Sequence, residues 1–167
     1  MRCEQCGGFK LFILQFGVLM NFAANGNQHW AITVNGGNIN VTNAGTGAVY
    51  ANTTGATDSY SAAAFSADGN LTINAGTVTT TSSGTGGKGL KADGSITIGT
   101  AATSPTLNIT TTGARFLVSG TDYNHPKTLV ATGAVVINNG DNRFTSTDDG
   151  IHSDASVTIN GGNNTVA

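Results

Sequence analysis

One short phrase returns along the chain, and its repetition limits the possible folds more than any other feature. The phrase is a turn containing Gly or Asp, followed by a short segment in which apolar residues alternate with Thr or Val. It is clearest at residues 66–74, 87–98 and 152–160, and it returns in variant form at residues 31–35 and 131–138. Such repetition is typical of architectures in which like segments stack on one another.

The spacing of the copies predicts a parallel β-helix. The alternating segments start at Ile32, Leu71, Ile96, Val135 and Val157, at intervals of 39, 25, 39 and 22 residues. The short intervals are one unit of 22–25 residues, and the two of 39 contain insertions near residues 45–60 and 113–128. Each unit reads as three short strands separated by turns, which makes about five coils of an all-β solenoid. A β-sandwich or barrel also has many short strands, but does not explain why the same phrase recurs at the same place.

Alternation along each strand predicts which side chains point into the core. The first strand of each unit places Ile32, Val34, Leu71, Ile73, Ile96, Ile98, Val135, Ile137, Val157 and Ile159 inside. The second and third strands add Ile39, Val41, Val78, Leu107, Ile109, Phe144, Phe65, Leu90, Leu129 and Ile151. Asn142 and Asn164 fall where other units carry Ile39 and Val78, which indicates either an Asn ladder between coils or a register shift of one residue.

The first 24 residues differ from the rest. A basic start, an apolar run over residues 11–20 and a small-residue exit are typical of a secretory signal peptide. The alternative is an apolar strand or helix that caps the stack. We therefore divide the chain into a signal-like or capping segment, residues 1–24, and a β-helix domain, residues 25–167, which ends in mid-strand and is expected to continue in a longer protein. Cys3 and Cys6 form one C-x-x-C without a second pair, which indicates no zinc site.

Charge is sparse, at 10% of residues with a net charge of −2, and this argues against a nucleic-acid partner. No segment is long enough to predict a membrane span. The expected location is outside the cell or at its surface.

Acidic residues gather at corresponding turns of the repeat. Asp68, Asp93 and Asp154 occupy one position of the unit, and Asp148 and Asp149 lie just before Asp154. Stacked carboxylates repel each other unless a cation bridges them. Because Ca²⁺ takes six to eight oxygen ligands in irregular geometry, we predict a calcium site here. The alternative is a solvated corner in which Asp side chains cap their own turns.

Basic and aromatic residues gather along one edge. Aligning the units places Lys88, Lys127 and Asp149 in one column and Lys91 and His152 in another, with the second insertion beside them. Ammonium groups suit the carboxylates of an acidic sugar chain, and an exposed aromatic ring offers a flat apolar face to a pyranose. The candidate carbohydrate-binding residues are Lys88, Lys91, Tyr123, Asn124, His125, Lys127 and His152. The alternative is a solvated lysine face with an ordinary surface loop.

Residues 66–73, 87–98 and 148–154 resemble a bacterial family of secreted carbohydrate-binding proteins, and the resemblance covers about residues 30–167. It implies a right-handed parallel β-helix with bound calcium, similar in shape to calcium-dependent pectate lyases. It also implies binding of plant cell-wall polysaccharide, including polygalacturonate, without established catalysis. The acidic corner of the family carries over to Asp148, Asp149 and Asp154, and less closely to Asp93 and Asp68.

Three functions are therefore open at this point. The first is non-catalytic binding of an acidic polysaccharide on a calcium-stabilised β-helix. The second is a polysaccharide lyase acting on uronate polymers, although no spacing of the three His residues or the acids specifies a catalytic set. The third is a structural, adhesin-like stalk in which the repeat only builds length.

Overall fold

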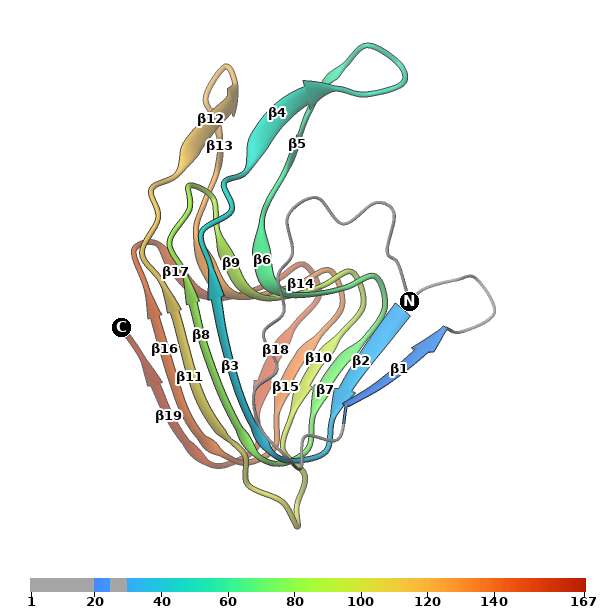
Figure 1. Ribbon diagram of the computed structural model, residues 1–167, viewed down its shortest axis with the longest axis vertical. Coiled ribbons are helices and arrows are strands. Elements are labelled where there is room, and N and C mark those ends of the chain that lie inside the picture. The colour runs from blue at the N-terminus through green and yellow to red at the C-terminus, as the bar shows by residue number, and fades with distance from the viewer. Residues whose placement is uncertain (1–19, 25–29) are drawn as a thin grey trace.

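The structure is a computed structural model that describes residues 20–24 and 30–167, and this part of the chain contains strands and no helix. Most strands belong to three sheets (Figure 1). The first sheet contains, in spatial order, β1 (Met20–Ala24), β2 (Trp30–Val34), β7 (Leu71–Ile73), β10 (Ile96–Ile98), β15 (Val135–Ile137) and β18 (Val157–Ile159). The second sheet contains β3 (Asn38–Asn43), β8 (Thr77–Ser82), β11 (Thr106–Thr111), β16 (Asp141–Ser146) and β19 (Asn163–Val166). The third sheet contains β6 (Ala63–Ala67), β9 (Lys88–Ala92), β14 (Lys127–Ala131) and β17 (Asp149–Ser153).

Apart from the β1–β2 pair, neighbouring strands within these sheets are parallel. The chain contributes one strand to the first sheet, one to the second and one to the third, and then repeats this order; we call each such round a pass. Each strand therefore pairs with the equivalent strand of the next pass. In the first sheet, Leu71 is in register with Ile32 and Ile96, and Val135 is in register with Ile96 and Val157. The predicted all-β class and the predicted alignment of the repeat are confirmed.

The second sheet decides between the two interpretations of Asn142. Leu107 pairs with Asn142, and Asn142 pairs with Asn164, without a shift in register. The Asn142 side chain is buried, and its Nδ2 donates a hydrogen bond to Asn164 Oδ1 at 2.9 Å. The ladder is confirmed and the register shift is wrong, because Asn142 pairs in register with Leu107 and Asn164 and its side-chain amide donates a hydrogen bond to the next Asn side chain.

The inward-facing side chains form one apolar core between the three sheets. Most of the predicted core residues are buried. Val157 and Ile159 were expected inside, but 47% and 52% of their surfaces are exposed. The prediction of burial is wrong there because no described strand stacks on the outer side of β18. Ile151, in the same last pass, is only partly buried.

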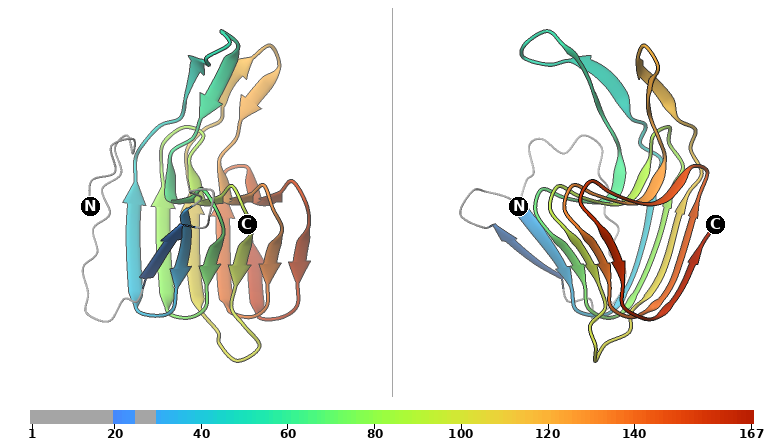
Figure 2. Two further views of the ribbon diagram at one scale, coloured as in Figure 1. Left: turned by 90° about the vertical axis from the view of Figure 1, so that its right-hand side faces the viewer. Right: turned by 180° about the vertical axis from the view of Figure 1, so that it is seen from behind.

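Both predicted insertions form antiparallel hairpins. The first hairpin consists of β4 (Ala48–Ala51) and β5 (Thr57–Tyr60), and the second of β12 (Phe116–Ser119) and β13 (Asp122–Asn124). Each leaves the repeat after a strand of the second sheet and returns to a strand of the third. The two hairpins therefore extend from the same corner of the molecule, beyond the three sheets (Figures 1 and 2).

The signal-like segment falls largely outside the described residues, as do Cys3, Cys6 and His29. Residues 20–24 form β1, which pairs antiparallel with β2 at the edge of the first sheet. Within the described residues, no helix has the length and apolar character that crossing a membrane requires.

Burial in the stacked core predicts a large effect of truncating Leu107. Leu107→Ala should lower the free energy of unfolding by about 2–5 kcal/mol, because its side chain is fully buried between two neighbouring passes. Leu117→Ala removes the same atoms from an exposed hairpin position and should change that energy by less than about 0.5 kcal/mol. Urea unfolding of both variants checks this, and equal losses would contradict the stacked core.

Candidate functional site

The two hairpins are held against each other and against the repeat by one aromatic ring. The Phe116 ring lies so close to Gly47 and Gly86 that neither position has room for a side chain. A Cβ added at Gly47 would be 2.5 Å from a ring carbon, and one added at Gly86 would be 2.4 Å from it. Asn124 links the hairpins through polar contacts. Its Oδ1 accepts a hydrogen bond from Ser61 Oγ at 3.0 Å, and its Nδ2 donates to Ser59 Oγ at 3.3 Å. The hairpins therefore form one unit with defined positions.

A shallow depression of about 290 Å³ lies where the hairpins meet the third sheet. It is lined by Ser59, Lys88, Val118, Asp122, Tyr123, Asn124, His125 and Lys127. Five of the seven predicted carbohydrate-binding residues therefore come together here, and Lys91 and His152 lie outside the lining. Sequence reasoning missed Ser59, Val118 and Asp122. The sequence did contain a signal for them. Both insertions follow the second strand of their units, so both must leave the repeat at the same corner and lie near each other.

Lys88 is buried, whereas the alignment of the repeat predicted it as an outward-facing residue that binds carbohydrate. Only 5% of the residue is exposed, and its Nζ donates a hydrogen bond to Asn124 Oδ1 at 2.8 Å and another to the His125 carbonyl oxygen. Burial, together with the neighbouring Lys127 ammonium, lowers the pKa of Lys88 to about 8, whereas Asp149 opposes the shift. Lys88 thus ties β13 to β9.

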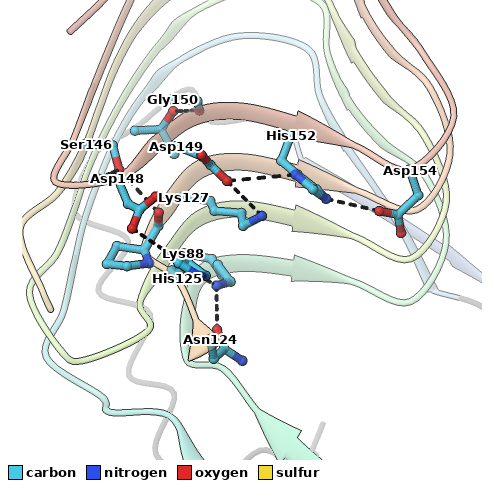
Figure 3. A network of polar contacts seen from close by, with 12 residues as sticks. Lys88, Asn124, His125, Lys127, Ser146, Asp148, Asp149, Gly150, His152 and Asp154 are labelled. Atoms are coloured by element: carbon cyan, nitrogen blue, oxygen red, sulfur yellow. Dashed lines mark hydrogen bonds and ion pairs between the residues drawn. The ribbon is translucent and has the colours of Figure 1, made fainter. Parts of the chain in front are cut away.

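The next lysine in the column is paired with an acid. Lys127 Nζ lies 2.9 Å from Asp149 Oδ2, as the register of β14 with β17 predicts (Figure 3). The hydrogen bond from Lys127 lowers the pKa of Asp149, although burial of the carboxyl opposes the change. His152 lies between two acids, with Nδ1 3.9 Å from Asp149 Oδ2 and Nε2 3.0 Å from Asp154 Oδ1. Lys127, Asp149, His152 and Asp154 therefore form a line of polar contacts that runs from β14 to β17 and the turn after it.

His125 and Tyr123 form the rim nearest the second hairpin. His125 Nδ1 lies 2.7 Å from Asp148 Oδ2, which orients the imidazole ring. Tyr123 stands edge-on to His125 with ring centroids 6.3 Å apart, and the Arg115 guanidinium carbon lies 4.3 Å from the Tyr123 centroid. Tyr123 is 36% exposed, so part of its surface is open to solvent.

The predicted calcium ligands do not converge. Asp148, Asp149 and Asp154 each face a different basic side chain (Figure 3). Asp93 Oδ1 lies 2.9 Å from Lys91 Nζ. Asp68 occupies the turn position equivalent to Asp93 in the preceding pass. Across residues 20–24 and 30–167, no group of three or more His, Cys, Asp or Glu side chains is arranged to hold a metal ion. As placed, the carboxylates do not fit one Ca²⁺, and calcium binding stays a prediction that a titration followed by thermal unfolding can test.

Comparison with known proteins gives one match. A family model described as "Carbohydrate-binding domain-containing protein" matches residues 84–167, about half of the chain. The matched residues include β9, the second hairpin and the last passes of the repeat, and thus most of the lining of the depression. No curated protein and no solved structure matches the chain.

The environment of Lys88 predicts a specific pH dependence of stability. In the unfolded chain this lysine keeps its proton up to its ordinary pKa of 10.5, whereas the folded protein releases it near pH 8. The unfolded state therefore binds more protons between these values, and the free energy of unfolding should rise with pH there by up to about 1.4 kcal/mol per pH unit.

Urea unfolding of the wild type and of Lys88→Met at several pH values between 7 and about 10 checks this prediction. The variant keeps the apolar stem and should lack this rise. The same pH dependence in both proteins would contradict a buried, weakly basic Lys88.

Proposed function

The chain belongs to the family of carbohydrate-binding domain-containing proteins, and we propose that it binds an acidic polysaccharide without cleaving it, at the depression between the two hairpins and the third sheet. The observation that carries this proposal is the gathering of Tyr123 and Asn124 of β13, Lys127 of β14 and Ser59 of β5 around one depression, although the first hairpin and the second are far apart in sequence. Family membership supports carbohydrate as the ligand, and the side chains that line the depression support it as the binding site.

The chemistry of the lining suits a uronate chain. Lys127 places an ammonium group at the depression, where a sugar carboxylate would compete with Asp149 for it. The partly exposed Tyr123 ring offers an apolar face to a pyranose, and its cation neighbour Arg115 holds the ring in place. Asn124 and Asp122 supply polar atoms for sugar hydroxyls. Lys88 acts indirectly, because its ammonium positions Asn124 and the His125 backbone.

We also propose that the repeat forms a right-handed parallel β-helix of about five coils, which holds this surface rigid. The parallel pairing of equivalent strands in three sheets supports the coils. Right-handed crossovers are strongly preferred between parallel strands of one sheet, which supports the hand. A polysaccharide-binding role further favours a position outside the cell or at its surface.

Affinity electrophoresis through gels containing polygalacturonate tests the proposed function. Tyr123→Ala and Lys127→Met should each weaken binding by about tenfold, because one removes the ring and the other the ammonium group of the depression. Lys91→Met removes the same charge outside the lining and should bind as the wild type does. If the wild type shows no retention, with or without chelator, acidic polysaccharide is not the ligand. Equal binding by all variants would favour a structural stalk.

One contact favours the lyase as a second candidate. His125 is oriented by Asp148 beside the weakly basic Lys88, which is how a general base for proton abstraction is often arranged. In such a β-elimination the base takes the proton from C5 of a uronate, a C4=C5 double bond forms, the C4–O bond breaks, and the departing oxygen of the neighbouring sugar takes up a proton from solvent. Release of unsaturated product, followed by ultraviolet absorbance, would favour this candidate if His125→Ala abolished it. No release by the wild type would remove it.

A further inference from the structure

All three tyrosines of the chain lie on the two hairpins, where Phe116 packs against Gly47 and Gly86 at their base. Tyr50 and Tyr60 belong to the first hairpin and are 46% and 54% exposed, whereas Phe65 and Phe144 are buried in the core of the repeat. Exposed rings on a segment that the repeat does not need for its own stacking indicate a binding role.

Strand pairing places both rings on the same face of the first hairpin. Tyr50 pairs with Asp58, and Tyr60 pairs with Ala48, so Tyr50, Asp58 and Tyr60 share one face. The ring centroids are 6.4 Å apart, with the ring planes inclined by 42°. Ser59 points to the opposite face, where it contacts Asn124 at the depression. The tyrosine face is therefore separate from the depression, although the same strand carries both.

Polar contacts organise this face. The Tyr50 hydroxyl donates a hydrogen bond to Asp58 Oδ2 at 3.1 Å, and the Ser59 backbone N–H donates to Asp58 Oδ1 at 2.7 Å. The hydrogen bond to Asp58 and its negative charge raise the pKa of Tyr50, so the hydroxyl keeps its proton to a higher pH than an ordinary tyrosine does.

The turn of the hairpin is also organised. Asn52 Oδ1 accepts hydrogen bonds from the backbone N–H groups of Thr54 and Ala56, and Gly55 takes a positive φ of 80°. The rings therefore sit on a hairpin with a defined turn rather than on an irregular loop.

We propose that Tyr50, Asp58 and Tyr60 form a second carbohydrate subsite, which stacks a pyranose residue of a neutral polysaccharide. The proposal rests on the proposed function, and it concerns a hairpin outside the matched residues 84–167. The two rings supply the apolar faces, and the Asp58 carboxylate accepts hydrogen bonds from sugar hydroxyls. Charge selects the class of sugar: residues 48–60 contain Asp58 and no Lys or Arg, so no ammonium group of this segment offsets the repulsion of a uronate carboxylate, whereas Lys127 accompanies Asp122 at the depression.

Affinity electrophoresis in two kinds of gel separates the two sites. One set contains the neutral polymers hydroxyethyl cellulose, galactomannan and arabinogalactan, each in its own gel, and the other contains polygalacturonate. The wild type should be retarded by at least one neutral polymer, and the Tyr50→Ala/Tyr60→Ala double variant should bind that polymer about tenfold more weakly. The double variant should keep its retardation by polygalacturonate.

Two control variants isolate the rings. Tyr60→Phe keeps the ring and should bind the neutral polymer within about twofold of the wild type. Val49→Ala alters an exposed side chain on the opposite face of the hairpin and should have no effect. The circular dichroism and thermal unfolding of all variants should match the wild type, which establishes that the repeat is intact.

The outcomes distinguish this inference from the proposed function. The inference is overturned if no neutral polymer retards the wild type, or if the double variant binds such a polymer as the wild type does. Retention by polygalacturonate that depends on Lys127 would still support the depression in either case. If retention on the neutral polymer is lost in Tyr123→Ala but not in the double variant, the depression binds neutral sugar and the tyrosine face does not.

Discussion

The pairing of each strand with its equivalent one pass later is the constraint on which the structure depends. It satisfies the backbone hydrogen-bonding groups of three sheets at once and places like side chains over like. In the first sheet, Leu71, Ile96 and Val135 form a continuous buried column for this reason. A coil alone could not bury such residues, so the stability of each pass comes from its neighbours. The same pairing stacks Lys88 on Lys127 and Lys127 on Asp149, and so produces the charges of the candidate site.

The hairpins add the two proposed binding surfaces to this framework without disturbing it. They leave and re-enter the repeat at one corner, so the strands on either side keep their register with neighbouring passes. Their position relative to each other depends on a few contacts, chiefly the Phe116 ring against two glycines and the bonds of Asn124. A rigid scaffold that carries exposed aromatic and charged side chains on inserted loops is a common way to build a binding surface. In this protein the depression and the tyrosine face both depend on that arrangement.

Periodicity predicted the parts of the structure that repeat. The register of Leu71 with Ile96 and the two insertions follow from aligning like with like. The same alignment left the Asn142–Asn164 ladder as one of two alternatives, and the structure decided between them. The parts that do not repeat could not be predicted in this way. Lys88 is buried because the second hairpin covers it, and its neighbour Ala63 in the preceding pass gives no sign of that. Four of the five acids that suggested calcium, Asp93, Asp148, Asp149 and Asp154, each lie beside a basic side chain, which side-chain conformation decides and spacing does not.

Amide chemical-shift mapping by NMR during titration with a short oligogalacturonate tests the central claim most directly. If acidic carbohydrate binds at the depression, shifts should concentrate at the residues that line it, in β13 and at the start of β14. Residues on the outer face of the second sheet, such as Thr79 and Thr110, should not respond. Saturable shifts on that face, with none around Tyr123 and Lys127, would contradict the account.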